Sequence, residues 1–138
     1  MNRHRRKIIW IMVLGALGVL PIAYFVGGAV RRHRCKKTLV RIISDADRAV
    51  VYDTTKPDIT REYAGNDLHI IVKAISESQS DDELYDTPVG LFSVEFYEGR
   101  RLLAEIGACS NLWRYRGRQY RAPHDSRFSE YLKIRESP

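Results

Sequence analysis

The chain has few of the residues that build cross-linked or metal-dependent sites. Its 138 residues contain two cysteines, Cys35 and Cys109, which are too few for a disulfide framework. No Asn is followed two places later by Ser or Thr, so an N-glycosylation signal is missing. Zinc-ligand spacing, a phosphate-binding glycine loop and a nucleophile elbow are missing as well. The sequence therefore predicts no cofactor, no metal and no catalytic set, and it favours a binding module over an enzyme.

Acidic residues are absent from the first part of the chain. Residues 1–37 contain nine Lys and Arg and no Asp or Glu, whereas the rest contains fourteen basic and seventeen acidic residues. The net charge of +6 therefore comes from the N-terminal segment, and the remainder has a net charge of −3. A nucleic-acid-binding role, which a basic protein suggests, loses its support. We expect no nucleic acid among the partners.

The basic N-terminal segment encloses an uncharged run. Residues 8–30 read IIWIMVLGALGVLPIAYFVGGAV, and as a helix they would span about 34 Å, against about 30 Å of hydrocarbon in a bilayer. Trp10 near one end and Tyr24 and Phe25 near the other are typical of interfacial aromatics. The run predicts one transmembrane helix. A cleaved signal peptide and a twin-arginine export signal are alternatives that its length and flanks favour less.

Lys and Arg flank the predicted membrane helix on both sides. The tail at residues 1–7 has four Lys and Arg, and the juxtamembrane segment at residues 31–37 has five. The one additional basic side chain favours a cytoplasmic domain but leaves the orientation open. Cys35 is either an unmodified thiol or a palmitoylation site. Ala23 and Gly27 form a small-xxx-small pair, so a weak homodimer stays open. The flanking basic residues are Arg3, Arg5, Arg6, Lys7, Arg31, Arg32, Arg34, Lys36 and Lys37.

Residues 38–138 predict one small α+β domain. Alternating apolar residues indicate strands, and apolar residues at i, i+3, i+4 and i+7 indicate a helix. The order is near ββαββββα, and short connections favour an antiparallel sheet with about two helices packed on one face. The expected elements are strands at 38–43, 48–53 and 59–63 with a turn at 45–47, a helix capped by Asn66 or Asp67 with Leu68, Ile71, Val72 and Ile75 inward, hairpins within 89–110 and 112–121, and a last helix capped by Asp125 or Ser126 with Phe128, Tyr131 and Leu132 inward.

The hairpin within residues 89–110 has the most regular alternation. Its apolar residues lie at even positions on both strands, so the two sets share a face only if even positions pair with even positions. A three-residue loop at 97–99, with Gly99 in a left-handed conformation, meets this condition, whereas a two-residue loop at 98–99 does not. The expected pairs are Phe96 with Arg100, Val94 with Leu102 and Phe92 with Ala104, and the inward set on the second strand is Leu102, Ala104, Ile106 and Ala108.

The hairpin within residues 112–121 carries the candidate binding residues. A two-residue loop at Arg116-Gly117 pairs Trp113 with Tyr120. Guanidinium groups beside aromatic rings suit phosphates, carboxylates and anionic lipid headgroups. Residues 99–138 carry a net +5 and residues 38–98 a net −8, and these halves can neutralise each other on folding. The candidate residues are Arg114, Arg116, Arg118 and Arg121, with Trp113, Tyr115 and Tyr120.

These patterns predict a single-pass membrane-anchored binding or accessory module. Its expected partners are the lipid bilayer, anionic lipid headgroups or another membrane protein. One alternative is a membrane-anchored enzyme with a dispersed site, for example around His124. Another is a structural subunit of a membrane complex. The acidic loop with Asp81, Asp82, Glu83 and Asp86 lacks the EF-hand order, so we expect it to be solvated.

Overall fold

The computed structural model describes residues 24, 26–28, 30–31, 33–81 and 90–133, and the chain forms two compact units, residues 1–34 and 35–138. The described residues of the first unit are helical. Within the described part of the chain, no helix has the length and apolar character needed to cross a membrane. Outside the described residues lie most of the predicted membrane helix at 8–30, the basic residues Arg3, Arg5, Arg6, Lys7 and Arg32, Ala23 of the small-residue pair, and Asp82, Glu83 and Asp86 of the acidic loop.

The folded domain begins with a helix at residues 35–43, where the sequence predicts a strand at 38–43. That prediction is wrong, although the β-branched residues of this segment do favour a strand locally. Leu39 and Ile43 are four residues apart and fully buried, and Cys35 packs against the same core. A spacing of four places all three side chains on one helical face, so burial in the core outweighs the local preference.

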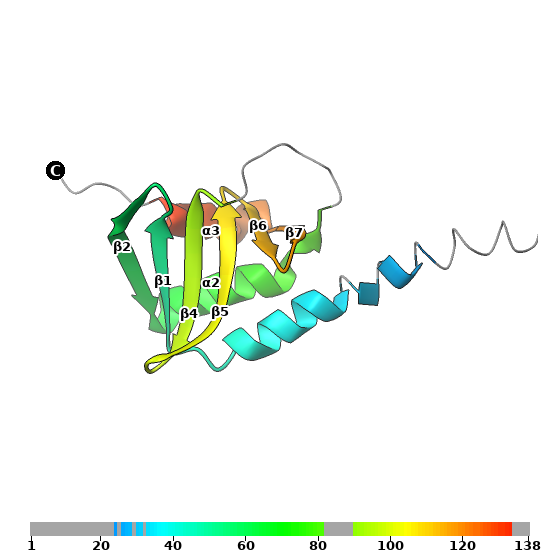
Figure 1. Cartoon of the computed structure of the whole chain (residues 1–138), viewed down its shortest axis with the longest axis horizontal. Coiled ribbons are helices and arrows are strands. Elements are labelled where there is room, and N and C mark those ends of the chain that lie inside the picture. The colour runs from blue at the N-terminus through cyan, green and yellow to red at the C-terminus, as the bar shows by residue number, and fades with distance from the viewer. Residues whose placement is uncertain (1–23, 25, 29, 32, 82–89, 134–138) are drawn as a thin grey trace, which may run out of the picture. The chain divides into compact units, whose positions relative to one another are not determined.

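Seven strands form one antiparallel sheet in the order β2-β1-β4-β5-β6-β7-β3 (Figure 1). The predicted α+β class and antiparallel sheet are confirmed. The first expected strand is missing, β2 is longer than expected, and the two-residue β3 has no signal in the sequence. The strands are β1 (Arg48–Asp53), β2 (Lys56–Ala64), β3 (Gln79–Ser80), β4 (Phe92–Glu98), β5 (Arg101–Cys109), β6 (Leu112–Tyr115) and β7 (Arg118–Arg121).

The helices α2 (Gly65–Glu77) and α3 (Phe128–Leu132) pack on one face of the sheet, and α3 follows a short 3-10 turn, η1 (His124–Ser126). The N-cap residues are Ala64 and Arg127, not the predicted ones, and neither makes a side-chain capping hydrogen bond, although Ser126 Oγ accepts from the Phe128 amide at 3.4 Å. Gly65 has φ of 57°, so a left-handed turn leads the chain from β2 directly into α2. The predicted inner faces are confirmed at Leu68, Ile71, Ile75, Phe128, Tyr131 and Leu132, whereas Val72 is half-buried and Ala74 takes the fourth buried position of α2.

One hydrophobic core lies between the helices and the sheet. Its largest fully buried side chains include Trp113, Tyr120 and Phe96. The Tyr63 hydroxyl donates to the backbone oxygen of Tyr131 at 2.8 Å, and the two rings meet edge to face at 5.0 Å. The Tyr131 hydroxyl donates in turn to Asp67 at 2.9 Å. These bonds join β2, α3 and α2, so the polar ends of both tyrosines are satisfied at the core margin.

The β4–β5 hairpin pairs even positions with even positions as predicted, but its loop and its residue pairs differ from the prediction. Its loop contains two residues, Gly99 and Arg100, and Gly99 has the expected positive φ, 58°. A bulge at Leu103 adds one residue to β5 and restores the pairing of even with even. Leu102 lies before the bulge and is 47% exposed, so its predicted inward position is wrong. The observed pairs are Phe96 with Ala104, Val94 with Ile106 and Phe92 with Ala108, in place of the three expected pairs.

Candidate functional site

The β6–β7 hairpin has the predicted register. Its loop is Arg116-Gly117, with φ of 47° and 73°, as a two-residue turn with left-handed residues requires. Trp113 pairs with Tyr120, and their rings stack with centroids 4.3 Å apart. The local signal was sufficient here, because the turn, the register and the aromatic pair lie within ten residues of one another.

The aromatic residues of this hairpin belong to the core. Trp113 and Tyr120 are 0% and 1% exposed, and Tyr115 is also buried. Trp113 and Tyr120 therefore lie in the core and not on an exposed surface with the arginines, whereas the Tyr115 ring stays in contact with the Arg116 guanidinium. Strand alternation separates them, because Trp113 faces the helices while Arg114, its neighbour, faces the open side of the sheet.

Three of the four predicted arginines surround the end of the hairpin, and we call Arg114, Arg116 and Arg118 the arginine tip. Arg114 donates to Gln119 Oε1 at 3.4 Å, and the Arg116 guanidinium lies over the Tyr115 ring, 5.3 Å from its centroid. Among the described residues, none of the three forms an ion pair with a carboxylate. The arginine tip therefore presents positive charge that the described fold does not neutralise.

Arg121, the fourth predicted arginine, has a different role. Its Nη2 and Nε atoms lie 2.9 Å and 3.2 Å from Asp81 Oδ2. The Asp81 side chain is 6% exposed, whereas the Arg121 side chain is 41% exposed. This ion pair places a cation beside a nearly buried carboxylate, next to the short β3–β7 pairing.

Lys36, in the segment that the sequence predicts to follow a membrane helix, connects the helix at 35–43 to the end of α2. Its Nζ atom donates to the backbone oxygens of Ser76 and Ser78, at 3.0 Å and 2.7 Å, where α2 ends. A cation is favourable there because the last carbonyl groups of a helix have no intrahelical donor. The Ser78 hydroxyl accepts a hydrogen bond from Trp113 Nε1 at 2.8 Å. One residue, Ser78, thus links Lys36 to the strand that leads into the arginine tip.

The open face of the sheet carries a second polar cluster, for which the sequence has no local signal. We call Tyr52, Ser93, Glu95, Tyr97 and Glu105 the carboxylate face. Glu95 and Glu105 are direct cross-strand partners on β4 and β5. The hydroxyls of Tyr52 and Tyr97 donate to the two oxygens of Glu95 at 3.3 Å and 2.5 Å, and Ser93 donates to Glu105 Oε1 at 2.7 Å.

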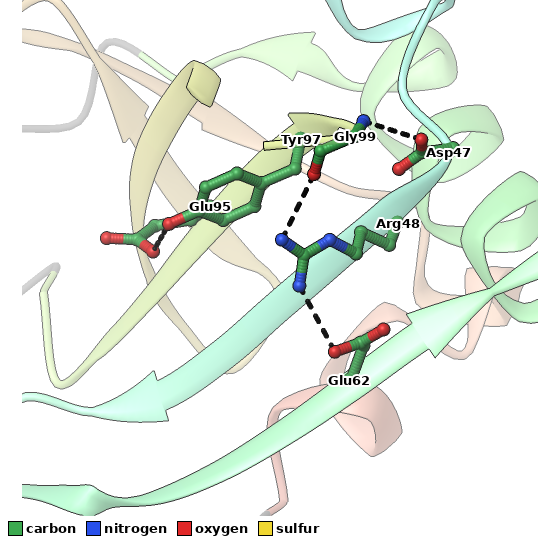
Figure 2. Close-up of polar contacts among 6 residues, drawn as sticks. All are labelled: Asp47, Arg48, Glu62, Glu95, Tyr97 and Gly99. Carbon is green, nitrogen blue, oxygen red and sulfur yellow. Dashed lines mark hydrogen bonds and ion pairs between the residues drawn. The ribbon is translucent and has the colours of Figure 1, made fainter. Parts of the chain in front are cut away.

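Arg48 borders the carboxylate face, as Figure 2 shows. Its guanidinium lies over the Tyr97 ring, 4.6 Å from the centroid, and donates to Glu62 Oε2 at 3.3 Å. A further bond to the backbone oxygen of Gly99, at 3.2 Å, fixes its orientation. The Tyr97 hydroxyl points away from Arg48 toward Glu95 (Figure 2). The ring thus contacts a cation on its face and a carboxylate at its hydroxyl.

The carboxylates change the acidity of both tyrosines. The hydrogen bond to Glu95, followed by burial, raises the pKa of Tyr97 above 10.0. For Tyr52, a hydrogen bond with Ser93 lowers the pKa, but burial and the charges of Glu95 and Glu105 together raise it by more. Both phenols therefore keep their protons at neutral pH and remain hydrogen-bond donors to Glu95.

Two depressions in the described surface contain ionisable side chains. One of about 330 Å³ contains Asp47 and His69, but the Asp47 carboxylate already accepts from the Gly99 amide at 2.6 Å. The other, of about 220 Å³, contains Lys73 and Glu77, whose Nζ and Oε1 atoms are 3.8 Å apart.

His124 is exposed, and its Nδ1 atom lies 3.2 Å from the side-chain amide nitrogen of Asn111. Over residues 33–81 and 90–133, no three His, Cys, Asp or Glu side chains gather as a metal site.

The arginine tip and the carboxylate face thus carry charges that form no ion pair within the described residues. The arginine tip was visible in the sequence as a run of alternating arginines. The carboxylate face was not, since it depends on the register of β4 with β5. Comparison with known proteins adds no family to this geometry, because no family model, no curated protein and no solved structure matches the chain.

Proposed function

We propose that the protein is a single-pass membrane-anchored accessory module whose domain binds anionic lipid headgroups through the arginine tip. The observation that carries the proposal is the set of three guanidinium groups without a carboxylate partner in the described residues. Unpaired arginines on a domain of net negative charge are poorly explained by stability, because surface charges usually contribute little to it.

The anchor in this proposal is the uncharged run at residues 8–30, which is long enough to cross a bilayer. Lys36 lies six residues after the end of that run, so even a fully extended chain would place it no more than about 20 Å from the headgroups. Lys36 and Trp113 share Ser78 as a hydrogen-bonding partner. The link through Ser78 ties the hairpin to a lysine that follows the proposed anchor in the chain.

Guanidinium groups suit this role for chemical reasons. A planar guanidinium donates two parallel hydrogen bonds to one phosphate, and it stays charged at every physiological pH. Each basic residue near an anionic membrane contributes about 1 kcal/mol of attraction. Three such groups on one hairpin would orient the domain on the membrane surface, and the exposed Lys37 adds a further positive charge to the domain.

The test is chemical footprinting of arginine in a defined bilayer. The full chain is reconstituted into nanodiscs of phosphatidylcholine alone, or of phosphatidylcholine with phosphatidylserine, and treated with phenylglyoxal. Mass spectrometry then measures the modification rate of each arginine. We expect Arg114, Arg116 and Arg118 to react several-fold more slowly in the anionic discs, and we expect this protection to disappear at high salt because the attraction is screened.

Arg61 and Arg100 are internal controls, because both are exposed and have no ion-pair partner in the described structure. Their rates should be the same in the two kinds of disc. Equal rates at the arginine tip in both discs would refute headgroup binding, as would equal protection of tip and controls. A chain that fails to copurify with the discs would refute the anchor.

A further inference from the structure

We propose that the carboxylate face binds a basic segment of a partner protein, and that arginine is the residue it recognises. Strand alternation places the face on the side of the sheet opposite the core residues Val94 and Phe96, and α2 and α3 pack on the core side.

Glu95 and Glu105 repel each other in the folded chain. Side chains that pair directly across two antiparallel strands have Cβ atoms about 5 Å apart, and like charges in that position are destabilising. Among the described residues, neither carboxylate forms an ion pair. Arg114, the nearest arginine by register, lies opposite Gly107 and donates to Gln119 instead. A cation bound between the two glutamates would remove this repulsion.

The acceptors of the carboxylate face are held in position before any ligand arrives. Both oxygens of Glu95 receive phenolic hydrogen bonds, and Glu105 receives one from Ser93. Ser93 is 3% exposed, so its hydroxyl is itself fixed by packing. A ligand therefore loses little affinity to the ordering of these side chains.

Arg48 shows which cation fits this surface. Glu62, Val50, Glu95 and Glu105 form one row across β2, β1, β4 and β5. At one end of the row, Arg48 combines a tyrosine ring with a glutamate, Tyr97 with Glu62. At the other end, Tyr52 lies beside Glu95 and Glu105, and among the described residues neither glutamate forms an ion pair. The same pairing of ring and carboxylate is thus repeated without its arginine.

The chemistry of the face favours a guanidinium over other cations. A divalent metal ion such as calcium needs six to eight oxygen ligands, and Glu95 already uses both oxygens as acceptors. A guanidinium needs only one or two free lone pairs from each carboxylate, and it can stack on a tyrosine ring at the same time. Lipid phosphate would be repelled by both glutamates. An arginine in a partner's basic segment meets all of these conditions.

The test uses the full chain in nanodiscs of phosphatidylcholine alone, so that anionic lipid plays no part and the result is independent of the headgroup proposal. A capped, fluorescent oligoarginine peptide is titrated and its binding is followed by anisotropy. We expect the double variant Glu95→Gln with Glu105→Gln to bind at least about tenfold more weakly. The matched control, Glu77→Gln with Glu130→Gln, removes the same two charges from exposed positions on the helices and should bind like the unmodified chain.

Two further arms separate arginine recognition from general attraction. An oligolysine peptide of the same length should bind several-fold more weakly, because lysine cannot form the planar paired contact. Tyr52→Phe keeps the ring and should retain most of the affinity, whereas Tyr52→Leu should not. Equal affinity of the two double variants, or of the two peptides, would refute the proposal. Self-association of the chain through this face would assign it to a second copy and would also overturn the partner-protein proposal.

Discussion

The arginine tip and the carboxylate face have opposite charge and lie on the same small domain, yet no ion pair joins them. The sequence allows its acidic and basic halves to neutralise each other, and at Arg121 and Asp81 the fold does so. Elsewhere, Arg116 rests on Tyr115 and Glu95 is held by two tyrosines. These unpaired charges are the observations from which we propose partners of opposite charge.

The first prediction separates the two kinds of arginine in the hairpin. Arg121→Ser should lower the free energy of unfolding by about 1–3 kcal/mol, because it leaves the nearly buried carboxylate of Asp81 without this cation. Arg118→Ser should change it by less than about 0.5 kcal/mol. Urea unfolding of the full chain in detergent, followed by tryptophan fluorescence, measures both. Equal losses would show that the arginine tip is part of the fold's own stability.

The second prediction concerns repulsion on the carboxylate face. Glu105→Gln should raise the stability at neutral pH by about 0.2–1 kcal/mol, because glutamine keeps an acceptor for Ser93 while removing the charge opposite Glu95. Glu77→Gln should change the stability by less than about 0.5 kcal/mol, because losing the exposed pair with Lys73 is offset by removing a negative charge from the C-terminal end of α2. Urea midpoints at neutral and acidic pH test this. A destabilised Glu105→Gln variant would contradict the repulsion.

The third and smallest prediction uses the acidity of Tyr97. Its pKa is raised in the folded chain, so above about pH 10 the unfolded chain loses this proton first and the folded state loses stability. Tyr97→Phe removes this contribution, and its stability should therefore fall less steeply as the pH rises from 10. Thermal unfolding of both chains across that interval measures the two slopes. Identical slopes would mean that Glu95 does not hold the Tyr97 proton.

The parts of the fold that could be predicted are the local ones. The β6–β7 register follows from a two-residue loop with glycine and from the Trp113–Tyr120 pair. The β4–β5 hairpin shows where local reasoning stops, because its parity was predictable but its pairs depend on a bulge at Leu103. In the segment at 38–43, the local sequence predicts the wrong element. Its composition favours a strand, and only the burial of Leu39 and Ile43 makes it a helix.

The candidate site also combines features that the local sequence predicts with features that depend on tertiary packing. Arg114, Arg116 and Arg118 could be identified from their spacing alone, but the burial of Trp113 could not be, since it depends on which side of the hairpin meets the helices. The carboxylate face could not be predicted from the sequence. A register with the three-residue loop and no bulge would place Glu95 opposite Arg101, a favourable pair, whereas the observed register places it opposite Glu105.

The sequence by itself determined the uncharged run, its basic flanks, the α+β class and the arginines of one hairpin, because each depends on composition or on contacts between near neighbours in the chain. The tertiary structure decided which surfaces remain charged. It turned a strand-like segment into a helix, docked Lys36 on the end of α2, and set two glutamates against each other across β4 and β5. The physical reason is that burial and strand register act over the whole core, and one extra residue in one strand is enough to change which charges meet.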